Sequence, residues 1–103
     1  MPTRMRGNLR QIAEVTAIKS VLKPRFKNVE AYRYNSASIR IRVVDQRFSA
    51  KSRGDREDMV LPLIRKLPES IRQDITFLVL IPPAERVTSL ASIEFDHPTP
   101  SRL

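Results

Sequence analysis

The sequence lacks most of the side chains on which common catalytic and metal sites depend. Among its 103 residues it has no cysteine, no tryptophan and a single histidine, His97. The lack of cysteine excludes disulfides, thiol nucleophiles and cysteine-ligated metal or iron–sulfur centres formed by this chain alone. A serine nucleophile needs a positioned base, and the only imidazole lies in a proline-flanked tail. We therefore predict that the protein is not an enzyme and that it holds no cofactor or metal.

Glycine and long apolar runs are scarce as well. With only Gly7 and Gly54, the chain has neither a P-loop or dinucleotide-type phosphate loop nor the GxxG clamp of KH domains. The longest apolar run, residues 75–81, is far shorter than the roughly 20 residues of a membrane-spanning helix. No apolar stretch of signal-peptide length follows Arg4 and Arg6. We expect a soluble protein of the cytoplasm with no membrane partner.

Three carboxylates lie close together in the middle of the chain. Asp55, Glu57 and Asp58 are neighbours of Arg53 and Arg56. A nearby positive charge keeps a carboxylate ionised, and acidic residues stabilise the start of a helix. We interpret these residues as structural and not as a metal or acid–base site.

Positive charge is abundant and unevenly placed. The net charge is +8, and residues 1–27 hold seven basic residues against one acidic residue, a net charge of +6. Residues 28–60 add a net +2 and residues 61–103 are neutral overall. A concentrated positive field favours polyanions such as DNA or RNA, because each neutralised phosphate releases counterions. The alternative is a solvated face that only keeps the protein soluble.

The first half of the chain predicts a helix and a β-hairpin. Apolar residues recur at helical spacing from Asn8 to Leu22, including Leu9 and Ile12; Asn8 is a plausible N-cap, and Pro24 ends the helix. Residues 29–34 and 37–44 read as antiparallel strands joined by a turn at residues 35–36.

The second strand of this hairpin alternates apolar and basic residues. Ile39, Ile41 and Val43 fall on one face, which we expect to meet the helices, and Arg40 and Arg42 fall on the other, which we expect to be exposed. Tyr32 and Tyr34 of the first strand lie near these arginines. Such a face suits single-stranded nucleic acid, with rings that stack bases and guanidiniums that hold phosphate. Alternatively, the tyrosines and arginines pack on each other by cation–π contact.

The second half predicts more helix and a third strand. Residues 52–67 have helical spacing, with a kink or a break into two helices at Pro62. A short helix over residues 69–73 follows, with Pro68 at or near its first position. Residues 75–81 form a strand, and residues 83–95 form a final helix through Ala84, Val87, Leu90 and Ala91.

These elements define the expected fold class. A strand, a helical crossover and a second strand usually pair in parallel. We therefore predict an α+β domain with a three-stranded mixed sheet, helices on one face and the order α-β-β-α-α-β plus a C-terminal helix. Ile75 or Phe77, together with Val79, should lie on the helix-covered face. We expect a flexible basic N-terminus over residues 1–7, one domain over residues 8–95 and a flexible tail over residues 96–103.

A short motif and this element order resemble the BolA-like family, whose fold is related to the type II KH arrangement. The motif is the run from Val44 to Lys51, with Arg56 eight residues after Phe48 and Val60 twelve residues after it. The resemblance covers residues 9–95 in element order. It implies the α-β-β-α-α-β fold and a regulatory role.

The chain departs from the family pattern at three places. Ala50 stands where the family usually has glycine, and Glu57 where it has histidine. The family shares an iron–sulfur cluster with a glutaredoxin partner through a histidine at the start of the last strand, a place occupied here by Ile75 or Thr76. A glutaredoxin-like partner is implied by the resemblance, but cluster ligation is not.

Two hypotheses for function follow. The first is association with nucleic acid, mainly through phosphate contacts. Its candidate residues are the basic side chains of the first helix and of the second strand and the loop after it: Arg10, Lys19, Lys23, Arg25, Lys27, Arg40, Arg42, Arg47, Lys51, Arg53 and Arg56. The second is a protein–protein adaptor that docks a partner or a second copy. It would use Leu78 and Leu80 on a second face of the last strand, or the segment from Val87 to Phe95.

Overall fold

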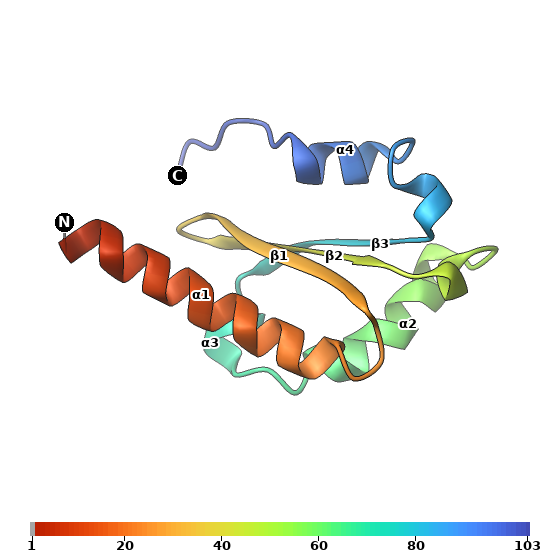
Figure 1. The fold of residues 1–103 in the computed structure, drawn as a ribbon, viewed down its shortest axis with the longest axis horizontal. Helices are drawn as coiled ribbons and strands as arrows, with labels where there is room; N and C mark the ends of the chain where they lie inside the picture. The colour runs from red at the N-terminus through yellow and green to blue at the C-terminus, as the bar shows by residue number, and fades with distance from the viewer. Residues whose placement is uncertain (1) are drawn as a thin grey trace.

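The computed structural model describes the backbone of residues 2–103 and the side chains from Leu9 onward. The elements are, in chain order, α1 (Pro2–Leu22), β1 (Asn28–Asn35), β2 (Ser38–Val44), a 3₁₀ turn η1 (Gln46–Phe48), α2 (Arg53–Ile64), α3 (Glu69–Arg72), β3 (Ile75–Ile81), a second 3₁₀ turn η2 (Pro83–Glu85) and α4 (Leu90–Asp96). Figure 1 shows α1, α2 and α3 on one side of the sheet and α4 on the other.

The three strands form one mixed sheet in the order β1-β2-β3. β1 pairs antiparallel with β2, and β2 pairs parallel with β3. The parallel pair needs a crossover, which α2 and α3 provide, while the hairpin needs only a tight turn. The predicted α+β class, element order and mixed sheet are confirmed.

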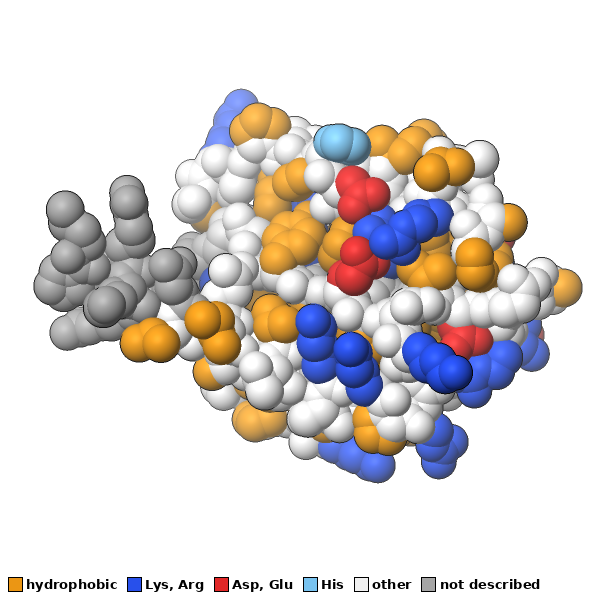
Figure 2. Space-filling model, in the orientation of Figure 1, with side chains coloured by type: hydrophobic (Ala, Val, Ile, Leu, Met, Phe, Trp, Pro, Cys, Tyr) orange, Lys and Arg blue, Asp and Glu red, His pale blue; other side chains and the backbone are white. Residues whose placement is uncertain are grey.

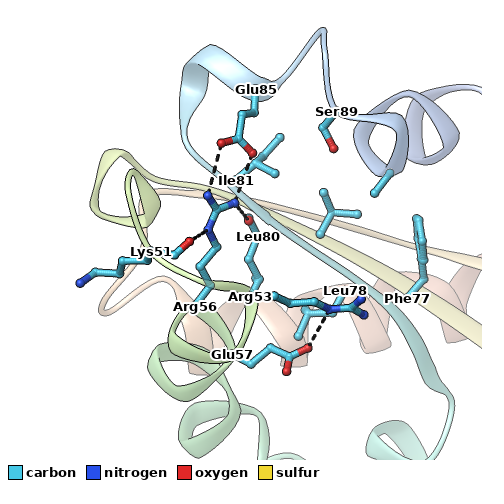
Figure 3. A pocket seen from close by; sticks show the side chains of 12 residues that line it. Lys51, Arg53, Arg56, Glu57, Phe77, Leu78, Leu80, Ile81, Glu85 and Ser89 are labelled. Carbon is cyan, nitrogen blue, oxygen red and sulfur yellow. Dashed lines mark hydrogen bonds and ion pairs between the residues drawn. The ribbon is translucent and has the colours of Figure 1, made fainter.

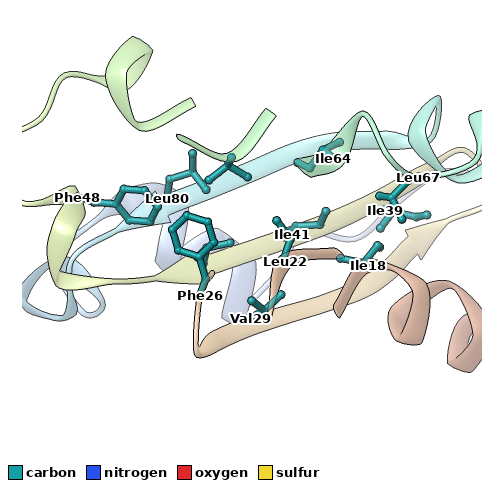
Figure 4. Packing of buried hydrophobic residues seen from close by; sticks show 12 residues of the cluster. Ile18, Leu22, Phe26, Val29, Ile39, Ile41, Phe48, Ile64, Leu67 and Leu80 are labelled. Carbon is teal, nitrogen blue, oxygen red and sulfur yellow. The ribbon is translucent and has the colours of Figure 1, made fainter. Parts of the chain in front are cut away.

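The main core lies between the sheet and helices α1 and α2. Ile39, Ile41 and Val43 of β2 are at most 1% exposed and face these helices, as the alternation predicted. Figure 4 shows β2 side chains meeting residues of α1 and α2, and Phe26 lies against Phe48 with ring centroids 5.7 Å apart. Phe26 thus fills the core, and two residues of the motif described above, Phe48 and Val60, are also core residues.

The register of β3 differs from the prediction. Ile39 pairs with Ile75 but Arg40 pairs with Phe77, so Thr76 is an extra residue that shifts the alternation. Leu78 and Leu80 consequently join the main core, and Phe77 and Val79 lie on the opposite face. Of the predicted pair Ile75 or Phe77, Ile75 packs on the main core, but the prediction for Val79 was wrong, and so was the placement of Leu78 and Leu80 on the second face. A strand apolar on both faces carries no pattern that reveals such a bulge.

Helix α1 is longer than predicted and only its second half packs on the sheet. It begins at Pro2, so Asn8 does not cap it. Ile18 and Leu22 are fully buried, whereas Leu9 and Ile12 are 63% and 61% exposed. Figure 1 shows that the first turns of α1 extend beyond the sheet. The apolar periodicity was therefore right for the helix and wrong for the burial of its first half.

The crossover helices follow the sequence closely. Ser52 caps α2, with its hydroxyl accepting from the N–H of Asp55, and the helix continues through Pro62 to Ile64. Pro62 lies in the last turn, where little helix remains to be broken, so α2 stays one helix and the predicted break at Pro62 does not occur. Pro68 is the N-cap of α3, one position before the first helical residue.

The C-terminal segment is interrupted and covers the second face of the sheet. The predicted continuous helix over residues 83–95 is wrong, because the segment is split into η2 and α4. Ser89 caps α4 by accepting from the N–H of Ser92, which starts the helix afresh. Phe95 of α4 packs in a second cluster with Val44, Val79 and Ile81. Among the described residues no helix is both long and apolar enough to cross a membrane.

Truncation of the central β2 residue tests this core. Ile41 is fully buried, so Ile41→Ala should lower the free energy of unfolding by about 2 to 5 kcal/mol, through lost burial and a residual cavity. Urea denaturation measures the loss. Ile12→Ala, in the exposed half of α1, is the matched control and should change stability by at most about 0.5 kcal/mol. A loss below about 1 kcal/mol for Ile41→Ala would place it outside the core.

Candidate functional site

The face of the sheet opposite α1 and α2 carries the predicted basic and aromatic residues, and it is covered. Arg42 is 1% exposed and the side chain of Arg40 is 11% exposed. The prediction that both arginines face solvent was wrong. Their alternation along β2 is as predicted, but α4 lies over them, and nothing in the pattern of a strand shows what packs on its polar face.

Arg42 is the most extensively bonded side chain of this face. Its Nε and Nη2 donate to the two carboxylate oxygens of Glu30 at 2.8 and 2.9 Å. Its Nη1 donates to Ser92 Oγ at 2.9 Å and to Asp96 at 3.0 Å. Its guanidinium carbon lies 4.5 Å from the ring centroid of Phe95. One guanidinium therefore joins β1, β2 and α4.

Arg40 and the two tyrosines are also bonded within the protein. The guanidinium carbon of Arg40 lies 3.6 Å from the ring centroid of Tyr34, and Nη1 donates to Glu94 at 2.8 Å. Tyr32 donates its hydroxyl to the carbonyl of Phe95 at 2.7 Å. The alternative interpretation, cation–π packing on the sheet, is confirmed for Arg40 and Tyr34. This face is not an open platform for stacking bases.

Arg10 belongs to a second ion-pair network at the other end of β1. Arg33 Nη2 bonds Glu14 at 2.6 Å and Asp74 at 2.8 Å, and Arg10 Nε bonds the same Glu14 at 3.2 Å. The hydrogen bond from Arg33 is the main reason why the pKa of Glu14 is lowered. Arg10 thus forms an ion pair within α1 while its side chain stays 59% exposed, and Glu14 joins α1 to the sheet through Arg33.

Exposed cations collect at the end of the molecule where α1 turns into β1. Lys23, Arg25 and Lys27 are exposed in this turn, and Arg47 of η1 lies beside them. We call these four residues the basic end. They line two open hollows that share Lys27, Asn28, Val44 and Pro83. Figure 2 shows Lys and Arg side chains gathered over the last part of α1 and this turn. Lys19 lies about one turn earlier on α1 and is half-buried.

Arg47 is held in place at the basic end. Its Nε and Nη2 each lie 2.9 Å from a carboxylate oxygen of Asp45, and its guanidinium packs 4.8 Å from the ring centroid of Phe26. It also donates to the carbonyl of Arg25. The hydrogen bonds from Arg47 lower the pKa of Asp45. Arg47 therefore stabilises the turn after α1, in addition to contributing positive charge to the basic end.

The other three predicted residues lie along a different part of the surface, beside β3. Lys51 and Arg53 are exposed, and Arg53 pairs with Glu57 of its own helix at 3.5 Å and with no other described residue. Arg56 is mostly buried and donates to the carbonyl of Leu80 at 2.8 Å and to Glu85. The eleven predicted residues thus do not form one stripe.

Two of the three carboxylates next to Arg53 lie where a structural role was expected. Asp55 lies in the first turn of α2, and Glu57 pairs with Arg53. In the part of the chain that the structure describes, no three His, Asp or Glu side chains gather in a way that suits a metal ion.

The sequence analysis did not identify several residues that organise these surfaces. Glu30, Ser92 and Asp96 hold Arg42, and Arg86 of the segment after η2 pairs with Glu30 at 3.3 Å. Ser92 and Asp96 lie 50 and 54 residues from Arg42 in the chain, and Arg86 lies 56 residues from Glu30. No local spacing signals such a long-range network.

Comparison with known proteins adds no relative on which to base a function. Neither models of known families, nor curated proteins, nor solved structures match this chain. The BolA-like resemblance stays a prediction that rests on residues 44–60 and on the order of the elements. At the start of β3 the chain has Ile75 and Thr76, and neither carries an imidazole.

Replacing Arg42 should loosen α4. Arg42→Met keeps much of the side-chain volume but leaves buried Ser92 without its partner and breaks the Glu30 and Asp96 contacts. We expect a loss of about 2 kcal/mol in urea denaturation, the scale of hydrogen bonds to charged groups. Arg86→Met, at a 44% exposed side chain of the same network, is the control and should cost at most about 0.5 kcal/mol. Equal losses for both variants would contradict a special role of Arg42.

Acid should weaken the contacts of α4. Hydrogen bonds from Arg40 and from Thr99 lower the pKa of Glu94 from 4.5 to about 2. A carboxylate whose pKa is lower in the folded state stabilises the protein above its unfolded pKa and loses that contribution as the pH falls through the folded pKa. Glu94→Gln should therefore show a smaller fall in Tm than the wild type between pH 4.5 and about pH 2.

The control for this measurement is Glu57→Gln, because the arginine partner of Glu57 is 91% exposed. This variant should lose Tm with acid as the wild type does. The same acid dependence in Glu94→Gln and the wild type would show that the Arg40–Glu94 pair does not contribute.

Proposed function

We propose that the protein binds nucleic acid through phosphate contacts at the basic end, without catalysing a reaction. Lys23, Arg25 and Lys27 supply the charge, and Arg47 braces the turn that presents them. Such contacts give affinity with little choice of sequence. The proposal moves the interface away from Arg40 and Arg42, which α4 covers.

One observation carries this proposal. Lys23, Arg25 and Lys27 are exposed, and none of them forms an ion pair with a residue that the structure describes. The arginines of the sheet, in contrast, are neutralised by Glu30, Glu94 and Asp96. A cation without a carboxylate partner keeps its full field, and a close group of them attracts polyanions.

The chemistry of the basic end also limits what it recognises. Phe26, the aromatic ring nearest to it, is 2% exposed and lies beneath Arg47. Without an exposed ring there is no stacking platform, which single-strand binders use for bases. We therefore expect similar affinity for duplex and single-stranded DNA or RNA.

A protein–protein adaptor is the second candidate function. Val87, Leu90 and Ile93 are 78%, 84% and 42% exposed, and Leu90 and Ile93 lie one helical turn apart on α4. Apolar side chains grouped on a surface mark contact sites more often than isolated ones do. Phe95, at the end of the predicted docking segment, is excluded because it is buried against the sheet.

Charge reversal at the basic end tests the first proposal. Lys23→Glu/Lys27→Glu should weaken binding of a mixed-sequence DNA by at least about tenfold at roughly 50 mM salt, where phosphate contacts are strong. The slope of log affinity against log salt should fall by about 2, because about two phosphate contacts are lost. Fluorescence anisotropy across a salt series measures both quantities.

Lys66→Glu/Arg102→Glu is the matched control, because it changes the net charge equally at exposed positions outside the basic end. It should keep most of the affinity. Equal loss in both variants would indicate a diffuse effect of net charge. No retention of DNA or RNA by the wild type at roughly 50 mM salt would reject the proposal and favour the adaptor.

A further inference from the structure

β3 is an edge strand whose outer side is only partly occupied. It pairs with β2 alone. The carbonyl of Ile81 accepts from Asp45 N on the β2 side at 2.9 Å. Because backbone groups alternate along a strand, those of Leu80 and Leu78 point outward. Arg56 Nη1 occupies the carbonyl of Leu80 at 2.8 Å, but no described residue outside the sheet hydrogen-bonds the backbone of Leu78. The edge is closed at its carboxyl end and open in its middle.

A groove follows this open edge. A cavity of about 410 Å³ lies between α2 and α4, with Phe77, Leu78 and Ala91 among its lining residues. A second hollow continues along the strand past Leu61 to Ile75. Figure 3 shows Phe77 and Leu78 on opposite sides of the strand, with the Arg56–Glu85 pair at the end of the groove. An added strand would alternate its side chains above and below in the same way.

The rim of the groove is basic. Two carboxylates, Glu57 and Glu85, line it and pair with Arg53 and Arg56, against five cations: Lys51, Arg53, Arg56, Arg65 and Arg72. The lining therefore has a net charge of +3, and Lys51 and Arg65 have no carboxylate partner among the described residues. A second copy of this chain would bring the same basic rim against it and be repelled. Charge complementarity therefore favours an acidic occupant.

We propose that the open edge of β3 binds an extended acidic segment of a partner protein, which adds to the sheet as a fourth strand. Main-chain hydrogen bonds to Leu78 give affinity, and the basic rim selects acidic side chains. The Arg56–Glu85 pair limits the added strand at its far end. This site is separate from the basic end and from Val87, Leu90 and Ile93, so it stands or falls independently of the proposed nucleic-acid binding.

A designed peptide tests the proposal on the full chain. The probe is a fluorescent peptide of about eight residues, somewhat longer than a typical strand, in which valine alternates with glutamate and aspartate. Fluorescence anisotropy should show saturable binding. A peptide of the same composition with the valines grouped at one end should bind at least about tenfold more weakly, because it cannot present one apolar face.

N-methylation of the peptide separates strand addition from simple charge attraction. Methyl groups on alternate amides remove one edge's hydrogen bonds and leave the other edge intact. Two peptides are compared, each methylated on one of the two alternating sets of amides. One of them should lose at least about tenfold in affinity while the other binds normally. Equal affinity of both would overturn the proposal without any change to the protein.

A substitution in the protein gives the second arm. Leu78→Pro removes the outward N–H, a change that edge strands tolerate. Leu78→Ala loses the same leucine side chain but keeps the N–H, and so is the matched control. Leu78→Pro should bind the peptide at least about tenfold more weakly than Leu78→Ala. If Leu78→Pro is unfolded by circular dichroism, the methylated peptides decide.

Charge reversal and self-association complete the test. Arg53→Glu/Arg65→Glu should abolish peptide binding, and Lys23→Glu/Lys27→Glu should leave it unchanged. The opposite pattern, or displacement of the peptide by DNA, would place the peptide at the basic end and overturn the proposal. A wild-type dimer in sedimentation that Leu78→Pro converts to monomer would show that a second copy takes the edge, which also overturns it.

Discussion

The buried guanidinium of Arg42 fixes α4 on the sheet and so determines which surfaces of the protein remain exposed. Arg42 points away from the main core and is 1% exposed, and a buried charge must be paired and fully hydrogen-bonded. Glu30 on the neighbouring strand supplies one carboxylate, but Ser92 and Asp96 come from α4. Arg42 therefore ties α4 to the sheet. Without α4 both a guanidinium and the apolar cluster around Phe95 would face water.

Because helices cover both faces of the sheet, the proposed nucleic-acid and peptide sites lie away from these faces. At one end, Lys23, Arg25 and Lys27 project from the turn after α1 without carboxylate partners among the described residues. Along β3, the backbone of Leu78 faces outward between basic side chains. The two surfaces differ in chemistry, one offering charge alone and the other charge with main-chain hydrogen bonds. Binding at one need not exclude binding at the other.

Local patterns in the sequence predicted the fold well and the site poorly. The alternation in β2 placed Ile39, Ile41 and Val43 in the core, and the helical spacing of residues 52–67, Pro68 and the run at residues 75–81 marked the crossover. Some failures were local, among them the expected cap at Asn8 and the continuous helix over residues 83–95, but those that concern the site are failures of long-range packing. The bulge at Thr76 leaves no trace in an all-apolar strand, and the cover of Arg42 depends on residues 50 or more positions away. The exposure of Lys23, Arg25 and Lys27 agrees with the high local density of positive charge, which the sequence shows directly.

Residue-by-residue mapping of a bound DNA is the most direct test of this arrangement. In an NMR titration of the isotope-labelled protein with a short mixed-sequence DNA, amide shifts should change between Lys23 and Asn28 and around Arg47. The amides of Arg40, Arg42 and α4 should stay unchanged, because α4 covers that face. Shift changes centred on Arg40 and Arg42, with loss of the α4 signals, would show instead that α4 opens and that the sheet face is the interface.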